Sequence, residues 1–221
     1  MKIRTGEMLS DRLSQDLAWR KKELADLSYY LKTTGESGTR KNVLARCGIA
    51  ILYAHWEGYI KNSGRNYLEF VTMQRLSLSE LKENLITLVL QNKISSVIET
   101  QKPSQLGFVT SFFLDELDKR ALLPYKSAIN TESNLSSKVF KEIIWCLGLD
   151  YGPFETKEKL IDSKLLGKRN HIAHGKDLEV DLDEFNQLHQ EVINMMDVFK
   201  NQLENSSTMK AFKKNQSELT R

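Results

Sequence analysis

The stretch from Leu165 to Gly175, which reads LLGKRNHIAHG, combines residue types that can act together on a phosphodiester. Arg169, Asn170, His171 and His174 fall within six consecutive positions. Arginine is a permanent planar cation that binds phosphate through two parallel hydrogen bonds. Histidine titrates near neutral pH, so it can both accept and donate a proton. A phosphate-binding group beside a proton carrier is the minimum required to cleave a phosphodiester without a metal ion.

Helical geometry sorts these side chains by face. Because a helix turns ~100° per residue, Asn170 and His174 lie nearly one above the other, with His171 on the same side and Arg169 flanking it. The apolar positions Ile161, Leu165 and Ile172 lie on the opposite stripe and are expected to face the core. Two alternatives stay open. The motif can straddle a helix end, where free backbone amides bind phosphate, or it can be an ordinary helix end with cationic residues in its last turn.

Positive charge is concentrated around this motif. The segment 157–176 carries six cations against two carboxylates: Lys157, Lys159, Lys164, Lys168, Arg169 and Lys176, with Glu158 and Asp162. A solvated helix surface rich in lysine has the same composition. The net charge of the whole chain is only +3, and four cations and one carboxylate in residues 208–221 account for it. The rest of the chain has no net charge, which argues against a protein that binds nucleic acid non-specifically over its whole surface.

Composition and motifs exclude several other classes. The 221 residues are 40% hydrophobic and 28% charged, as in a folded soluble protein. No apolar run approaches the ~18–20 residues that span a membrane, and the N-terminus has no signal-peptide stretch, so we expect a cytoplasmic protein without a membrane partner. Cys47 and Cys146 lie in apolar segments and are expected to be reduced core residues. A zinc site at His171 and His174 would need Cys47, Cys146 or His189 nearby as a further ligand. The sequence contains no Cys-x-x-Cys or His-Glu-x-x-His pattern that would support such a site. We therefore expect no metal and no cofactor.

The remaining periodicity is helical throughout. Leucines at positions 9, 13, 17, 24, 27 and 31 form one stripe of a long helix. Further helices are expected at 41–72, 81–98 after Ser77 or Ser79, 108–122, from a Ser133–Asn134 cap to Gly148, 156–174 with Gly175 as its stop, and from Asp181 or Asp183 to about Glu204. Loops are expected at 35–39 and around Pro103. The fold class is therefore all-α, a bundle of about six or seven helices. Residues 1–204 form the domain, and residues 205–221 form a polar basic tail that is expected to be flexible.

The motif and its surroundings resemble a known superfamily. Arg169-Asn170-xxx-His174 is similar to the Arg-(four to six residues)-His motif of the HEPN superfamily, many of whose members are ribonucleases. Ile161-Asp-x-x-Leu-Leu before the arginine, and Ile172-Ala-His-Gly175 after it, resemble the superfamily as well. Arg46 and the segment from Ile51 to Ile60 (ILYAHWEGYI) resemble the second helix of the MAE-type HEPN-like nuclease branch. The resemblance covers about residues 10–200.

The resemblance implies a HEPN-like fold and a metal-independent endoribonuclease, used as a toxin or in phage defence, that works as a homodimer with a composite site. It implies proton transfer by His174, scissile-phosphate binding by Arg169, orientation of His174 or a phosphate contact by Asn170, and a second acid or base in His171. RNA is the implied substrate, and a cognate antitoxin or sensor protein is the implied partner.

Three further residues are candidate supports of this site. They are Glu57, Arg46 and Lys168, although Glu57 also suits a solvated face and Arg46 a surface ion pair. His55 is expected to be a half-buried structural residue. The alternative functions are a non-catalytic HEPN module that binds nucleotide or a protein partner, and a helical scaffold without a site.

Overall fold

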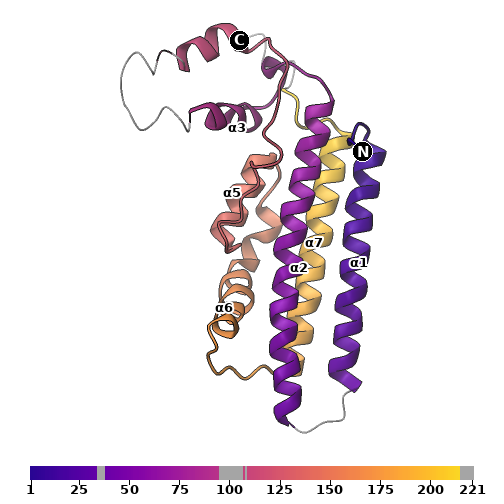
Figure 1. Ribbon diagram of the computed structural model, residues 1–221. Helices are drawn as coiled ribbons and strands as arrows, with labels where there is room; N and C mark the ends of the chain where they lie inside the picture. Colours follow the sequence, from indigo (N-terminus) through magenta and orange to yellow (C-terminus); the bar gives the residue numbers. More distant parts are fainter. Residues whose placement is uncertain (34–37, 95–106, 108, 215–221) are drawn as a thin grey trace.

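Three long helices pack side by side along the length of the molecule (Figure 1). The computed structural model describes residues 1–33, 38–94, 107 and 109–214. The helices are α1 (Gly6–Thr33), α2 (Gly38–Met73) and α7 (Leu182–Thr208), and each contacts the other two. The predicted leucine stripe of α1 faces this bundle, with Leu9, Leu13, Leu17, Leu24 and Leu31 buried. Burial of this stripe against two partner helices is what stabilises the long helix.

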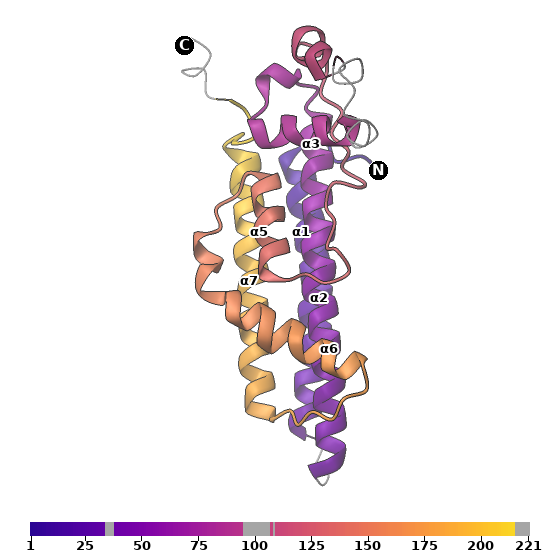
Figure 2. The same ribbon diagram turned by 90° about the vertical axis from the view of Figure 1, so that its left-hand side faces the viewer.

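A second layer covers one side of α2 and α7 (Figure 2). It consists of α5 (Ser137–Leu147), a 3-10 helix (Gly152–Lys157), a π-helix (Leu160–Gly167) and α6 (Lys168–Ala173). Phe140 of α5 joins the layers, because its ring lies 5.0 Å from Trp56 of α2, 4.9 Å from Phe154 and 6.1 Å from Phe199 of α7. Helix α3 (Glu83–Ile94) lies above α5 at the end of the bundle where α2 finishes. Another π-helix spans Phe112–Glu116.

The all-α prediction is confirmed, since the described residues form helices and no strand. Individual helix starts differ from the expected ones. Ser136, rather than Ser133 or Asn134, is the N-cap of α5, and its hydroxyl accepts the Val139 amide at 3.3 Å. Ser77 precedes a short 3-10 helix (Leu78–Glu80), and α3 itself begins only at Glu83. Of the predicted loop at 35–39, residues 35–37 lie outside the described residues, and α2 already begins at Gly38. The end of the third helix beyond residue 94 and the turn around Pro103 also lie outside the described residues.

The chain after Glu204 is more ordered than expected. Helix α7 continues to Thr208, and the prediction of a flexible chain from residue 205 is wrong for residues 205–214. Phe212 is buried with its ring 5.9 Å from Phe70, its carbonyl accepts the Lys82 amide at 3.0 Å, and the Lys214 amide donates to the Glu80 carbonyl at 2.9 Å. One buried aromatic ring and two backbone hydrogen bonds thus hold this basic segment against the domain. Residues 215–221 lie outside the described part.

The two cysteines lie in different environments. Cys47 is exposed on α2, so its assignment to the core was wrong. Cys146 is half-buried, and burial raises the pKa of its thiol to about 11. In the described part of the chain, no helix combines the length and apolar character needed to cross a membrane.

Candidate active site at the end of α6

A π-helix sets the direction in which α6 presents the motif. Ile161 and Leu165 in this π-helix are fully buried, which anchors it to the bundle. The wider π-turn brings the Gly167 Cα close to the Asp162 carbonyl, where a Cβ would lie only 3.1 Å from that oxygen. The predicted segment 156–174 is therefore helical, but its middle is a π-helix rather than an α-helix. Because a π-turn rotates all later residues, Ile172 does not continue the stripe of Ile161 and Leu165 and is only half-buried.

The motif ends in a well-formed C-cap. Gly175 has φ +68°, its amide donates to the Ile172 carbonyl at 3.1 Å, and the Lys176 amide donates to the His171 carbonyl at 3.0 Å. This pair of bonds is a Schellman motif, and it confirms Gly175 as the stop. His174 is the C-cap residue. The cap fixes the backbone of both histidines and leaves their side chains exposed, where a bound substrate can reach them.

Arg169 is held in place by contacts on several sides. Its Nη1 donates to the Asn170 Oδ1 at 2.8 Å and to the Asn134 Oδ1 at 3.2 Å. Its guanidinium carbon lies 4.8 Å from the centre of the Tyr53 ring, within the range of a cation–π contact. The side-chain oxygens of Asn134 and Asn170 thus both accept hydrogen bonds from Nη1 of Arg169. The Nε and Nη2 edge of the guanidinium, which is one of its two bidentate edges, makes no hydrogen bond within the described residues.

Tyr53 links this arginine to the core. The ring is 1% exposed, and its hydroxyl accepts the Leu135 amide at 2.7 Å. Burial raises the pKa of Tyr53 to about 12; the Glu57 carboxylate at its hydroxyl also raises this pKa, while the Leu135 amide and the Arg169 charge lower it. Glu57, one helical turn after Tyr53 on α2, is half-buried rather than on a fully solvated face.

The loop that carries Asn134 is also held by a contact with the π-helix that precedes the motif. Asp162 accepts the Ser137 amide at 2.7 Å and the Ser137 hydroxyl at 2.6 Å, which ties the π-helix to the start of α5. Just before Asn134, Glu132 and Ser133 have φ of +51° and +64°. Such conformations are costly for non-glycine residues and persist where the surroundings impose them. The strained turn delivers the Asn134 side chain to Arg169.

The remaining predicted supports have structural contacts. The Arg46 Nη2 donates to the Lys176 carbonyl at 3.0 Å, so it anchors the segment after the cap. Lys168 forms an ion pair with Glu184 of α7. This ion pair joins α6 to the bundle, and the Glu184 carboxylate balances the charge of the lysine. Neither residue is brought to the free edge of Arg169.

His55 is buried, with only 5% of its surface exposed, and so is less accessible than the half-buried residue expected. The Arg20 Nη1 lies 3.4 Å from its Nδ1, and the Glu23 Oε2 lies 3.3 Å from its Nε2. Its role is thus structural, between α1 and α2.

Two residues of the site, Tyr53 and Asn134, were not among the predicted ones. Tyr53 entered the sequence interpretation only as part of the Ile51–Ile60 segment, and Asn134 only as a helix cap, although both contact Arg169. The site as built contains a fixed arginine and two exposed histidines. The residues that the structure describes include no group of three His, Cys, Asp or Glu side chains arranged to hold a metal ion.

The fold and the site together define an all-α domain that presents an arginine–histidine motif at a capped helix end. A protein-family model described as RiboL-PSP-HEPN matches residues 15–205. The chain belongs to this HEPN family, which confirms the superfamily resemblance of the motif. HEPN domains are often ribonucleases, so the family supports a role connected with RNA. Comparison with curated proteins and with solved structures gave no match.

Proposed function

We propose that this protein is a metal-independent endoribonuclease. The observation that carries the proposal is the fixed guanidinium of Arg169 with a free bidentate edge, on the same short helix as the exposed His171 and His174. A planar Nε–Nη2 edge matches two oxygens of a phosphate. Histidine supplies the proton transfers that cleavage at neutral pH requires.

The proposed reaction is an internal transesterification. A base takes the proton of a ribose 2′-hydroxyl, and the 2′-oxygen attacks the adjacent phosphorus. The bond from phosphorus to the 5′-oxygen then breaks, and an acid gives that oxygen a proton. The products are a 2′,3′-cyclic phosphate and a 5′-hydroxyl. We assign proton transfer to His174, with His171 as the second acid or base, and stabilisation of the phosphorane charge to Arg169. Asn170 acts on Arg169, since its amide oxygen accepts the guanidinium N–H.

A homodimer is part of the proposal, because two apposed motifs supply two arginines and two pairs of histidines around one phosphate. An exposed apolar stripe supports a seam on α2: Leu44, Cys47 and Ile51 recur at three- and four-residue spacing and are solvent-exposed. Arg46 and Tyr53, which contact the motif region, lie on a different face of α2, so the stripe is proposed only as an apolar contact of the dimer.

Cys47 makes the seam testable. A short bismaleimide added to the wild type at micromolar concentration should give a covalent dimer, and Cys47→Ser should abolish it, because the thiol of Cys146 is half-buried with a raised pKa. Sedimentation of the same samples should give a dimer. A monomer that cleaves RNA at the full rate would refute the composite site.

Expression in a sensitive bacterial host tests the activity. A ribonuclease of this kind is toxic unless a cognate antitoxin or an infection sensor restrains it, and such a protein is the proposed partner. Wild type should stop growth and fragment cellular RNA, whereas His174→Ala should not. The exposed Lys164→Gln is a matched control on the preceding turn and should behave as wild type. Equal behaviour of wild type and His174→Ala would instead indicate a binding module.

A further inference from the structure

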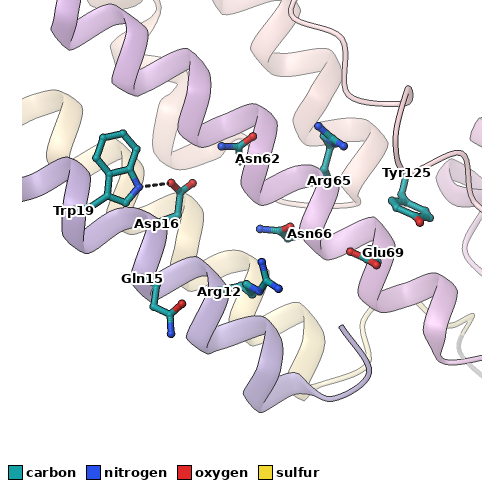
Figure 3. Close-up of a pocket in the computed structure, with 9 residues that line it drawn as sticks. All are labelled: Arg12, Gln15, Asp16, Trp19, Asn62, Arg65, Asn66, Glu69 and Tyr125. Carbon is teal, nitrogen blue, oxygen red and sulfur yellow. Dashed lines mark hydrogen bonds between the residues drawn. The ribbon is translucent and has the colours of Figure 1, made fainter. Parts of the chain in front are cut away.

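A polar groove lies between α1 and α2, away from the motif (Figure 3). Its volume is about 460 Å³, within the range of small-molecule sites. Figure 1 places α1 and α6 on opposite sides of α2, so this groove is separate from the candidate active site. The side chains come from both helices, with Trp19 at one end and Tyr125 at the other (Figure 3).

The charges of the groove are unbalanced in favour of cations. Its two carboxylates already have cationic partners: the Arg20 Nε lies 3.0 Å from Asp16, and the Lys2 Nζ lies 3.2 Å from Glu69. In contrast, Arg12 and Arg65 have neither an ion pair nor a hydrogen bond with any part of the chain that the structure describes. Two uncompensated guanidinium groups in one groove favour an anionic ligand, and planar forks of this kind suit phosphate.

The aromatic end of the groove is exposed yet oriented. Trp19 is 49% exposed, its Nε1 donates to the Asp16 Oδ1 at 2.8 Å, and the Arg20 guanidinium lies 4.6 Å from its ring centre. The hydrogen bond fixes the indole, while half of its surface stays open to solvent. A fixed aromatic ring is a stacking platform that accepts any planar base.

The middle of the groove offers amide groups. Asn62 and Asn66 of α2 and Gln15 of α1 line it, and none of these three side chains makes a hydrogen bond within the described residues. An amide presents both donors and an acceptor, so it can pair with the edge of a heterocyclic base. The groove thus combines two guanidinium groups without ion-pair partners in the described residues, a stacking ring and base-edge partners.

We propose that this groove binds a nucleoside phosphate, with the base on Trp19 and the phosphate on Arg12 and Arg65. The ligand can be a free mononucleotide or the phosphorylated end of an RNA strand, and both present the same chemistry. The site is additional to the proposed ribonuclease centre and does not depend on it.

Calorimetric titration of the full chain tests the proposal. The His174→Ala variant is used so that RNA is not consumed, and the probes are the four 5′-mononucleotides, inorganic phosphate, a nucleoside, and short RNAs with a 5′-phosphate or a 5′-hydroxyl. Binding of mononucleotides indicates a free-nucleotide site, and binding only of 5′-phosphorylated RNA indicates a strand-end site; either result supports the proposal. Arg65→Gln, Arg12→Gln and Trp19→Leu should each weaken binding at least tenfold. Lys61→Gln, an exposed cation of α2 outside the groove, should not change it.

Three results would overturn the proposal. The first is absence of binding to every nucleotide and RNA end. The second is affinity for inorganic phosphate equal to that for the nucleotides, which would mean that the base is not recognised. The third is nucleotide binding that survives all three groove substitutions. Arg12 is exposed and Arg65 is half-buried at the groove surface, and melting curves of the variants will test whether each is folded.

Discussion

Substitutions of Tyr53 separate its structural role from its role at the site. Tyr53→Phe keeps the ring beneath Arg169 but removes the hydroxyl that accepts the Leu135 amide at 2.7 Å. Leu135 is completely buried, so its N–H would lose its partner, at a cost of about 1–3 kcal/mol. For a domain of this size, about 2–4 °C is expected per kcal/mol. Tyr53→Phe should therefore lower the melting temperature by roughly 2–12 °C, while RNA cleavage per folded molecule stays close to wild type.

Tyr53→Leu removes the ring as well. The lost cation–π contact with Arg169 is worth about 0.5–2 kcal/mol, and the guanidinium is then held only by Asn134 and Asn170. We expect cleavage per folded molecule to fall much further than in Tyr53→Phe. The assays are thermal and urea unfolding, and single-turnover cleavage at a temperature where every variant is folded. Unchanged cleavage by Tyr53→Leu would refute the argument that the ring positions Arg169, and unchanged stability of Tyr53→Phe would refute the role of the hydroxyl.

Three further predictions concern the cap, the α6 anchor and pH. Gly175→Ala should cost about 1–2 kcal/mol in urea unfolding, because alanine resists a left-handed conformation, and Gly175→Asn should cost less; equal costs would contradict the cap argument. Lys168→Gln should lower the unfolding free energy by no more than about 1 kcal/mol and leave cleavage intact; a large loss of cleavage at unchanged stability would place Lys168 in the site. Burial, and then the Arg20 charge, lower the pKa of His55, although Glu23 and Asp16 oppose this. The unfolded chain therefore binds more protons below pH ~6.5. The unfolding free energy should fall as the pH drops from 7.5 to 5.5, and less steeply in His55→Gln; an identical slope in both proteins would contradict this.

Local sequence patterns were sufficient to predict the bundle. The leucine stripe of α1 and the apolar face of α5 repeat at helical spacing, and these residues are buried against neighbouring helices. The stop at Gly175 was also predictable, since glycine adopts positive φ at the lowest cost. In the same way, the arginine–histidine motif was found because its residue types and spacing are local.

The features that escaped prediction depend on tertiary contacts. The π-helix before α6 has no local signature, and it is accompanied by the bonds of Asp162 to Ser137, 25 residues away. Tyr53 has the sequence pattern of an ordinary core residue, and only the packing of α6 across α2 places a cation over its ring. The packing of Phe212 against Phe70 was likewise not predictable from local sequence, because the two residues are far apart in the chain.

The central claim is that the arginine–histidine motif cleaves RNA by 2′-hydroxyl attack without a metal ion. The most direct measurement is the end-group analysis of a defined RNA incubated with the purified chain in EDTA, for wild type, His174→Ala and Arg169→Lys. Wild type should leave 2′,3′-cyclic phosphate and 5′-hydroxyl ends, His174→Ala should leave the RNA intact while remaining folded, and Arg169→Lys should lose much of the rate because it lacks the planar fork. Cleavage that needs added magnesium or manganese, 5′-phosphate ends, or full activity of folded His174→Ala would contradict the account.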